Sequence, residues 1–197
     1  MYIFSKKILD YSLALLLSFL SLPLLLTCIF LIIIIDKQNP FFLHLRAGKN
    51  GKPFYLLKLR SMKHNTILDE HSSISKLGHF IRKYKIDELP QLLNVLIGNL
   101  SIVGPRPLLI SYINKYSAYH RSRLDVLPGI TGLAQINVFN TSNWKKKLDL
   151  DVIYVNEKSF FLDIKIIFNS VKLLFLILTN KVKIKENFTP YKNKSKL

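Results

Sequence analysis

Cysteine is almost absent from this 197-residue chain. Its one cysteine, Cys28, excludes an internal disulfide framework and makes the reducing cytoplasm the default compartment. The five histidines do not fall at the spacings of zinc ligands, and no cysteine cluster accompanies them. Neither a P-loop nor a glycine-rich dinucleotide fingerprint occurs. Any binding of phosphate must therefore depend on Mg²⁺ and arginines.

Acidic residues are also few. The chain has 12 Asp and Glu against 29 Lys and Arg, a formal net charge of +17, and 49% of its residues are hydrophobic. This combination suits a protein that lies against an anionic membrane, where each nearby cation contributes about 1 kcal/mol. Charge alone fits a nucleic-acid binder equally well. No predicted helix interleaves aromatic and basic residues as a nucleic-acid reading helix does, so we expect a membrane partner and no nucleic acid.

A long uncharged segment runs from Tyr11 to Ile35. At 1.5 Å per residue its helix would be about 37 Å long, which exceeds the ~30 Å of a bilayer's hydrocarbon core. A secretory signal peptide has a shorter apolar region and a small-residue cleavage site, and neither feature is visible here. We therefore expect this segment to remain as a membrane helix.

Pro23 lies near the middle of that segment and should kink the helix. Basic residues flank the segment on both sides, which by the positive-inside rule places both ends in the cytoplasm. A helix that breaks at Pro23 and re-enters the same leaflet satisfies this rule, but kinked spanning helices are also common. The residues alone leave both arrangements open. The flanking basic residues are Lys6, Lys7, Lys37, Arg46, Lys49 and Lys52.

A second apolar stretch, residues 160–178, carries a polar residue at roughly every third or fourth position, including Asp163 and Lys172. This pattern is typical of a helix in the plane of the membrane interface, and also of an ordinary amphipathic helix packed on its domain. Both interpretations remain open. The Lys- and Asn-rich tail after Asn180 should be poorly ordered.

Between the two apolar segments the pattern predicts one α+β domain dominated by helices. Residues 40–62 read as two strands around a turn at Gly48–Gly51, and residues 63–73 as a polar loop. Residues 128–137 read as loop with a short strand. Predicted helices cover residues 74–85, 90–97 (stopped by Gly98), 108–126 and 144–154.

Asp87 and Glu88 precede the predicted helix that starts at Pro90. Backbone N–H groups at a helix N-terminus favour negative charge, so Asp87 should be ionised at neutral pH. An ionised carboxylate can attack phosphorus or bind a hard metal ion. The alternative is that Asp87 only caps the helix. Glu88 could serve as a proton acceptor, or simply as an acidic residue in a first turn.

Arg106 lies between two prolines, which keep it out of any helix and fix its backbone. A rigidly held guanidinium is a good bidentate clamp for phosphate, although a surface arginine in a turn would look the same. Lys58, Arg60 and Arg82 supply further positive charge. Together these cations could neutralise a substrate with several phosphates beside the carboxylates.

Three blocks of this sequence resemble the small monotopic phosphoglycosyl transferases of the bacterial sugar transferase family. They are DELPQL (87–92), GPRP (104–107) and PGITG (128–132), and the similarity extends from Lys6 to about Lys172. No large multi-span region precedes them, so we expect the minimal form of the family. The resemblance favours a re-entrant, kinked N-terminal helix and a monotopic membrane protein with interfacial helices. We divide the chain into that helix (1–36), a catalytic domain (37–180) and a basic tail (181–197).

By this resemblance the chain should move a sugar 1-phosphate from a UDP-sugar to undecaprenyl phosphate, releasing UMP, as the first membrane step of glycoconjugate assembly. It implies that Asp87 forms a covalent phosphosugar intermediate and binds Mg²⁺, with Glu88 as its partner carboxylate. It further implies a location on the cytoplasmic face of the bacterial inner membrane; whether the chain forms a homodimer is left open. The implied substrate-binding residues are Arg106, which would hold the donor phosphate, Arg82, a candidate for the lipid phosphate, Lys58, Arg60 and Gln135.

The sequence departs from the family's pattern at three places. Leu22 precedes Pro23 where serine is usual, and His44 replaces a usual glutamine. Val138–Phe139 follows the AQIN motif where Gly-Arg is usual, which puts the identity of the sugar in doubt. A catalytically inactive scaffold of a glycan pathway is the alternative function, and the intact Asp87, Glu88 and Arg106 argue against it.

Overall fold

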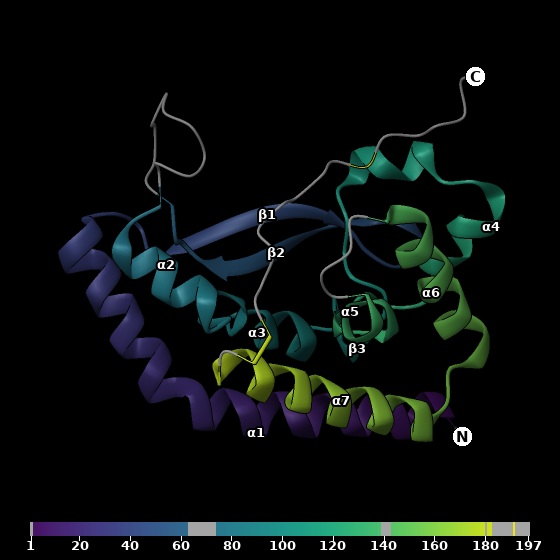
Figure 1. The fold of residues 1–197 in the computed structure, drawn as a ribbon, viewed down its shortest axis with the longest axis horizontal. Coiled ribbons are helices and arrows are strands. Elements are labelled where there is room, and N and C mark those ends of the chain that lie inside the picture. The colour runs from purple at the N-terminus through teal and green to yellow at the C-terminus, as the bar shows by residue number, and fades with distance from the viewer. Residues whose placement is uncertain (1, 63–73, 139–142, 180, 183–190, 192–197) are drawn as a thin grey trace.

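The computed structural model of the chain describes residues 2–62, 74–138, 143–179, 181–182 and 191. The predicted loop at 63–73 and most of the predicted tail lie outside these residues. Helices dominate the fold, as predicted, together with two small sheets (Figure 1). In chain order the helices and strands are α1 (Tyr2–Leu31), β1 (Phe41–Ala47), β2 (Pro53–Leu59), α2 (Lys76–Lys83), α3 (Gln91–Leu96), β3 (Ser101–Val103), α4 (Ala118–Arg121), β4 (Gly129–Thr131), α5 (Leu133–Asn137), α6 (Trp144–Glu157) and α7 (Phe160–Leu178).

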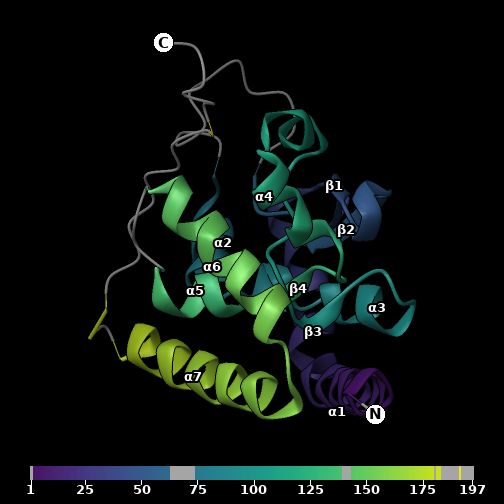
Figure 2. The same cartoon turned by 90° about the vertical axis from the view of Figure 1, so that its right-hand side faces the viewer.

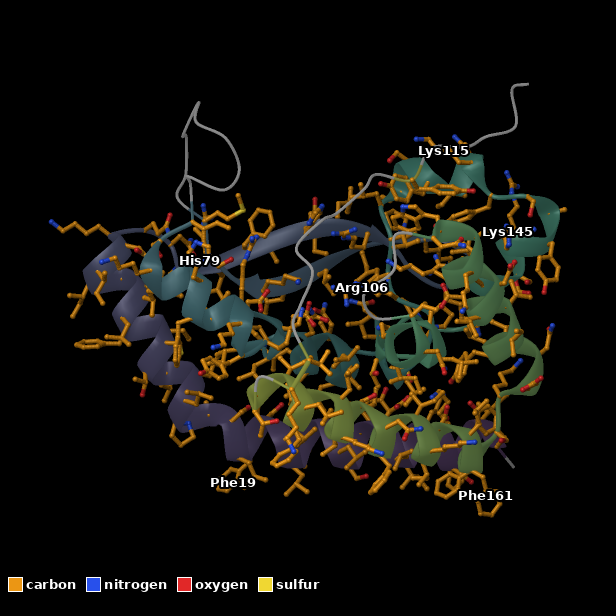
Figure 3. All side chains as sticks on the ribbon, in the orientation of Figure 1. Phe19, His79, Arg106, Lys115, Lys145 and Phe161 are labelled. Carbon is orange, nitrogen blue, oxygen red and sulfur yellow. The ribbon has the colours of Figure 1, made fainter. Side chains whose placement is uncertain are left out.

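The N-terminal helix α1 is continuous through Pro23 and ends in a π-helical turn, Ile32–Asp36. Figure 1 shows that it is sharply bent, and Figure 3 places Phe19 by the bend. A proline inside a helix removes one backbone hydrogen bond and clashes with the preceding turn, which accounts for a kink here. By length and composition α1 could cross a membrane, and most of its large apolar side chains are exposed.

Helix α7 lies beside the first part of α1, and the two form a layer beneath the rest of the domain (Figure 2). Apolar side chains of α7 such as Phe161 and Phe168 are 85% and 71% exposed on the outer face. Asp163 is one of the polar residues in this stretch, and it lies on the side of α7 that packs on the domain. It is fully buried and accepts hydrogen bonds from Lys6 Nζ (2.9 Å), Tyr2 Oη (3.0 Å) and Tyr154 Oη (2.8 Å). Helix α7 is therefore both packed on the domain and apolar outside.

The second half of α1 is attached to α2. Cys28 and Ile32 pack with Ile81 in one buried cluster. Ser75, the N-cap of α2, also donates its hydroxyl to Asp36 Oδ2 at 2.9 Å. The chain passes directly from α2 into the segment that carries Asp87 and Glu88. The apolar helix and this acidic pair therefore share one packed unit.

Strands β1 and β2 form the predicted antiparallel hairpin, in which Phe41 pairs with Leu59 and Ala47 with Pro53. Its turn lies within the predicted Gly48–Gly51, where Asn50 and Gly51 adopt positive φ values of 55° and 73°. Such backbone conformations are accessible mainly to glycine and asparagine.

The continuous helix predicted over residues 108–126 is wrong. The structure has a 3₁₀ segment at Ile110–Lys115, the short α4, and a second 3₁₀ turn at Ser122–Leu124. The backbone is extended at Tyr116 and Ser117, and the Ser117 hydroxyl accepts from the His120 amide to start α4 anew. Serine at this position thus begins a helix instead of continuing one. The predicted strand after Pro128 is confirmed as β4, but helix α5 was not predicted.

Candidate active site

Asp87 and Glu88 lie in a 3₁₀ turn, Ile86–Glu88, between α2 and α3. Lys85 enters this turn in the left-handed conformation, with φ 59°. The interpretation of Asp87 as a helix cap is wrong. Helix α3 follows Pro90 and has no side-chain cap, whereas the Asp87 carboxylate is directed to a lysine on the hairpin. Asp87 is only 8% exposed, so its side chain is a buried acid with a specific partner.

That partner is Lys58 of strand β2. Its ammonium lies 3.0 Å from Glu88 Oε1 and 3.5 Å from Asp87 Oδ2, and so contacts both carboxylates. A buried amide fixes the strand against α3. Asn94 accepts a hydrogen bond from the Leu57 amide (3.0 Å) and donates one to the Tyr55 carbonyl (2.8 Å). This clamp holds Lys58 opposite the acidic pair.

Arg106 is the second cation that contacts the acidic pair. Its Nη2 lies 3.0 Å from Glu88 Oε1, the oxygen that Lys58 also contacts. As predicted, Arg106 lies outside any helix, and its side chain is 48% exposed. Figure 3 shows it in the middle of the molecule, between the hairpin and the α1–α7 layer. A half-exposed guanidinium beside the buried Asp87 and the partly buried Glu88 is available to an anionic ligand.

Close contact between two backbones holds the Arg106 loop. Gly104 N–H donates to the Thr131 carbonyl and Gly129 N–H to the Pro105 carbonyl, both at 2.9 Å. A Cβ added to Gly129 would come within 2.1 Å of the Gly104 nitrogen. Only glycine allows such an approach. The GPRP and PGITG motifs therefore act as one structural unit that presents Arg106.

The two carboxyl groups differ in acidity. Burial raises the pKa of the Asp87 carboxyl, Lys58 offsets this only in part, and the negative charge of Glu88 raises it further. Burial alone would also raise the pKa of Glu88, but the charges of Arg106 and Lys58 outweigh it and hold that pKa well below its usual range. Glu88 in turn raises the pKa of Arg106. Glu88 is thus the fixed charge of the pair, and Asp87 depends on its surroundings for ionisation.

A sequence profile of bacterial sugar transferases matches residues 1–176. The chain belongs to the bacterial sugar transferase family. It is 50% identical over 137 residues to an uncharacterized sugar transferase, EpsL, of Bacillus subtilis, covering 67% of this chain and 68% of that protein.

Two further relatives of this sugar transferase have names that state an activity. The UDP-glucose:undecaprenyl-phosphate glucose-1-phosphate transferase of Caulobacter vibrioides is 34% identical over 184 residues, covering 86% of this chain and 69% of the relative. The UDP-galactose-lipid carrier transferase of Erwinia amylovora is 34% identical over 190 residues, which cover 85% of this chain and 40% of that protein. The transferase therefore spans about two fifths of the length of the Erwinia relative.

Three other predicted site residues make contacts away from the acidic pair. Arg82 Nε donates to the Ser61 hydroxyl at 2.9 Å. Arg60 Nη2 donates to the Phe41 carbonyl at 3.2 Å, at the start of the hairpin. Gln135 donates to the Ile130 carbonyl at 3.1 Å, and its buried Oε1 has no hydrogen-bond partner in the described part of the chain. The structure thus brings together four of the predicted residues of the transferase: Asp87, Glu88, Lys58 and Arg106.

Sequence reasoning missed two cations beside Arg106. Burial and then the charge of Arg106 lower the pKa values of both Arg46 and Lys147. Arg46 Nη2 contacts His44 Nδ1 at 3.2 Å, and because a guanidinium can only donate, that nitrogen must be the acceptor of a neutral ring. The alternation of His44 and Arg46 in a strand could have indicated a shared face. Lys147 is one of three consecutive lysines, and nothing in that run distinguishes it.

Proposed function

We propose that this transferase moves a sugar 1-phosphate from a UDP-sugar to undecaprenyl phosphate, with release of UMP, through a covalent intermediate on Asp87. The observation that carries the proposal is the convergence of Asp87 with Glu88, Lys58 and Arg106 in a chain of this family. Two carboxylates flanked by cations suit a diphosphate substrate and a carboxylate nucleophile. The relatives' names, which refer to UDP-sugars and lipid carriers, support the same reaction.

The reaction then has two displacements at one phosphorus. A carboxylate oxygen of Asp87 attacks the phosphate that carries the sugar, the bond between the two phosphates breaks, and UMP leaves with that bond's electron pair. A phosphate oxygen of the lipid next attacks the same phosphorus and releases the Asp87 carboxylate, which gives a sugar-diphospholipid. Lys58 orients both carboxylates, and Arg106 offsets charge on the phosphates. One site can thus serve a soluble donor and a lipid acceptor in turn.

A panel of UDP-sugars tests this function. UMP release in the presence of undecaprenyl phosphate is expected with at least one donor, and UDP-glucose and UDP-galactose are the first to try because relatives are named for them. Without lipid, a donor labelled in its sugar should leave label on the protein. Absence of UMP with every donor would favour the inactive scaffold, and turnover without labelled protein would favour direct transfer.

We propose that the residues at this site can hold Mg²⁺. Among the described residues no group of three or more His, Cys, Asp or Glu could hold a metal ion. Mg²⁺ does not need such a cage, because it commonly binds one or two carboxylates together with waters and substrate phosphates. Asp87, with Glu88 beside it, would hold the ion. When bound, Mg²⁺ would neutralise charge on the diphosphate.

Removal of Mg²⁺ should therefore stop the transfer. With excess EDTA we expect UMP release to fall to background, and excess Mg²⁺ should restore it. The thermal unfolding temperature is the control, because a structural ion would change it in the absence of substrate. Full activity in EDTA would contradict a role for a divalent ion.

We further propose that α1 dips into one leaflet and returns, so that the transferase is monotopic on the cytoplasmic face of the inner membrane. The bend in α1, its exposed apolar side chains and the basic residues on both flanks support this topology. The apolar outer face of α7, beside α1, would lie in the same interface.

Cysteine labelling distinguishes this topology from a spanning helix. Lys7 and Lys49 flank the apolar segment and are both exposed. In a Cys28→Ser background, Lys7→Cys and Lys49→Cys should react with a membrane-impermeant maleimide from the same side of sealed vesicles. Reaction from opposite sides would show that α1 spans the bilayer. Reaction in detergent controls for the accessibility of each cysteine.

A further inference from the structure

A buried ion pair lies directly behind Arg106. Arg123 and Asp151 are 3% and 4% exposed. Arg123 Nε and Nη2 donate to Asp151 Oδ2 at 3.0 and 2.8 Å, and Nη1 donates to the Tyr116 hydroxyl at 3.1 Å. Nη2 also donates to the backbone carbonyl of Arg106 at 2.7 Å. One guanidinium thus joins α6 and the segment before α4 to the loop that carries Arg106.

The backbone around Arg106 has few other polar groups to hold it. Pro105 and Pro107 have no N–H group, and their rings fix φ on either side. The loop is tied to its surroundings by Gly104 N–H to the Thr131 carbonyl, by Gly129 N–H to the Pro105 carbonyl, and by Ala47 N–H to the Leu108 carbonyl, each at 2.9 Å. Between these ties the Arg106 carbonyl has the Arg123 hydrogen bond. Fixing that carbonyl limits the movement of the peptide group after Arg106, and so limits the movement of the Cα that carries the Arg106 side chain.

A buried ion pair is weak evidence for stability, because well-packed apolar residues often replace such pairs at no cost. Its geometry is more informative. The planar guanidinium offers five donors in a rigid fork, and here the fork is fixed by Asp151 and Tyr116 while one donor remains for Arg106. A lysine ammonium could pair with Asp151 but could not reproduce this fork. An arrangement that needs arginine indicates a requirement for orientation.

We propose that Arg123 is a positioning residue for the phosphate clamp: held by Asp151 and Tyr116, it fixes the Arg106 carbonyl so that the Arg106 guanidinium reaches Glu88 and the donor's phosphate. This inference rests on the proposed function for the identity of the substrate. Nothing in it requires Arg123 to touch substrate. Arg123 bonds to the backbone carbonyl of Arg106, whereas the Arg106 side chain bonds to Glu88.

The kinetic test is Arg123→Lys, which keeps the charge opposite Asp151. We expect the KM for the UDP-sugar to rise about tenfold, with a smaller change in kcat and none in the KM for the lipid. His120→Gln is the matched control, because His120 pairs with Asp149 at 2.8 Å and so joins α4 to α6 without contact to Arg106. A purely structural role would lower the amount of active enzyme and leave the donor KM unchanged, and that result would overturn the proposal.

A double-mutant cycle tests whether Arg123 acts through Arg106. In an Arg106→Ala background, Arg123→Lys should have no further effect on kcat/KM for the donor. If the two substitutions lowered kcat/KM for the donor independently, so that their effects multiplied in the double variant, the proposal would be overturned. If Arg123→Lys does not fold, Tyr116→Phe removes a single hydroxyl and should raise the donor KM by about two- to threefold, again only when Arg106 is present.

Amide hydrogen exchange tests the same inference without turnover. Loosening the loop should speed amide exchange at Ala47, Gly104 and Gly129, because the N–H group of each makes a hydrogen bond between the loop and its surroundings. We expect at least a tenfold increase in Arg123→Lys and none in His120→Gln. Unchanged exchange would overturn the proposal. Because this measurement needs no substrate, it decides the role of Arg123 even if no donor proves active, and failure of the proposed function then remains distinct.

Discussion

Replacement of Asp87 by asparagine is expected to lower UMP release by at least about 10⁴-fold, because an amide oxygen is a poor nucleophile toward phosphorus. Asparagine keeps the size of the side chain and can still accept a hydrogen bond from Lys58, so the packing around this buried position should persist. Label from the UDP-sugar should not appear on the variant protein. The measurement is UMP release at saturating donor and lipid, together with labelling in the absence of lipid.

Asp125→Asn is the matched control, since it removes an exposed carboxylate and should leave the rate unchanged. Thermal unfolding of both variants checks that the fold is retained. A labelled Asp87→Asn protein that turns over at the normal rate would remove Asp87 from the role of nucleophile. A slow residual rate without label would instead indicate direct attack of the lipid on the donor.

Replacement of Arg106 should produce the second largest loss. We expect kcat/KM for the UDP-sugar to fall about 10²-fold in Arg106→Lys and about 10³-fold in Arg106→Ala, because a planar fork close to Glu88 cannot be replaced by a point charge. The loss of the guanidinium also removes the cation that does most to hold down the pKa of Glu88. Steady-state UMP release at varied donor concentration measures the effect.

The exposed Arg121 provides the control for this prediction, and Arg121→Lys should behave as the unaltered protein. The KM for undecaprenyl phosphate should not change in Arg106→Lys, because the role assigned to Arg106 concerns the donor. If kcat/KM for the UDP-sugar were normal in Arg106→Lys, a positive charge at this position would be enough for donor binding. An effect confined to the lipid would move Arg106 to the acceptor site.

Local features of the sequence predicted much of the fold. The Gly48–Gly51 turn between alternating apolar residues predicted the hairpin, and Gly98 predicted the end of α3, where its φ is +81°. The parallel pairing of β3 with β4 was not predicted, because each strand has three residues and no periodicity to detect. The prediction of one helix over residues 108–126 failed for a different reason. The short apolar runs on either side of Ser117 together resemble one helix, but Ser117 caps the start of a separate helix, α4.

The candidate site was predictable in part. The sequence distinguishes the acidic pair, Asp87 and Glu88, because acidic residues are rare in this chain. It distinguishes Arg106 because two prolines enclose it. The residues alone marked Lys58 only as one of three cations that could neutralise a phosphate substrate, and the family resemblance placed it in the site. Its contact with Asp87, across a separation of 29 residues, comes from the structure. No local pattern pointed to Arg123. Its partner Asp151 is 28 residues away in the sequence, and Tyr116, seven residues away, belongs to no recognisable motif. Tertiary contacts of this kind cannot be read from spacing.

The junction between α1 and α2 links the proposed membrane helix to the acidic turn. The far limb of α1 is packed on α2 through Cys28, Ile32 and Ile81, and the Ser75–Asp36 hydrogen bond closes the joint. The acidic turn follows α2 after only two residues. Helix α1 and the turn that carries Asp87 are therefore joined by packed contacts. In the proposed topology, the depth of the α1 bend in the leaflet would set the height of the Asp87 carboxylate above the acyl chains. If that topology holds, thinner or thicker leaflets would raise or lower the carboxylate relative to the lipid phosphates, and turnover would depend on leaflet thickness.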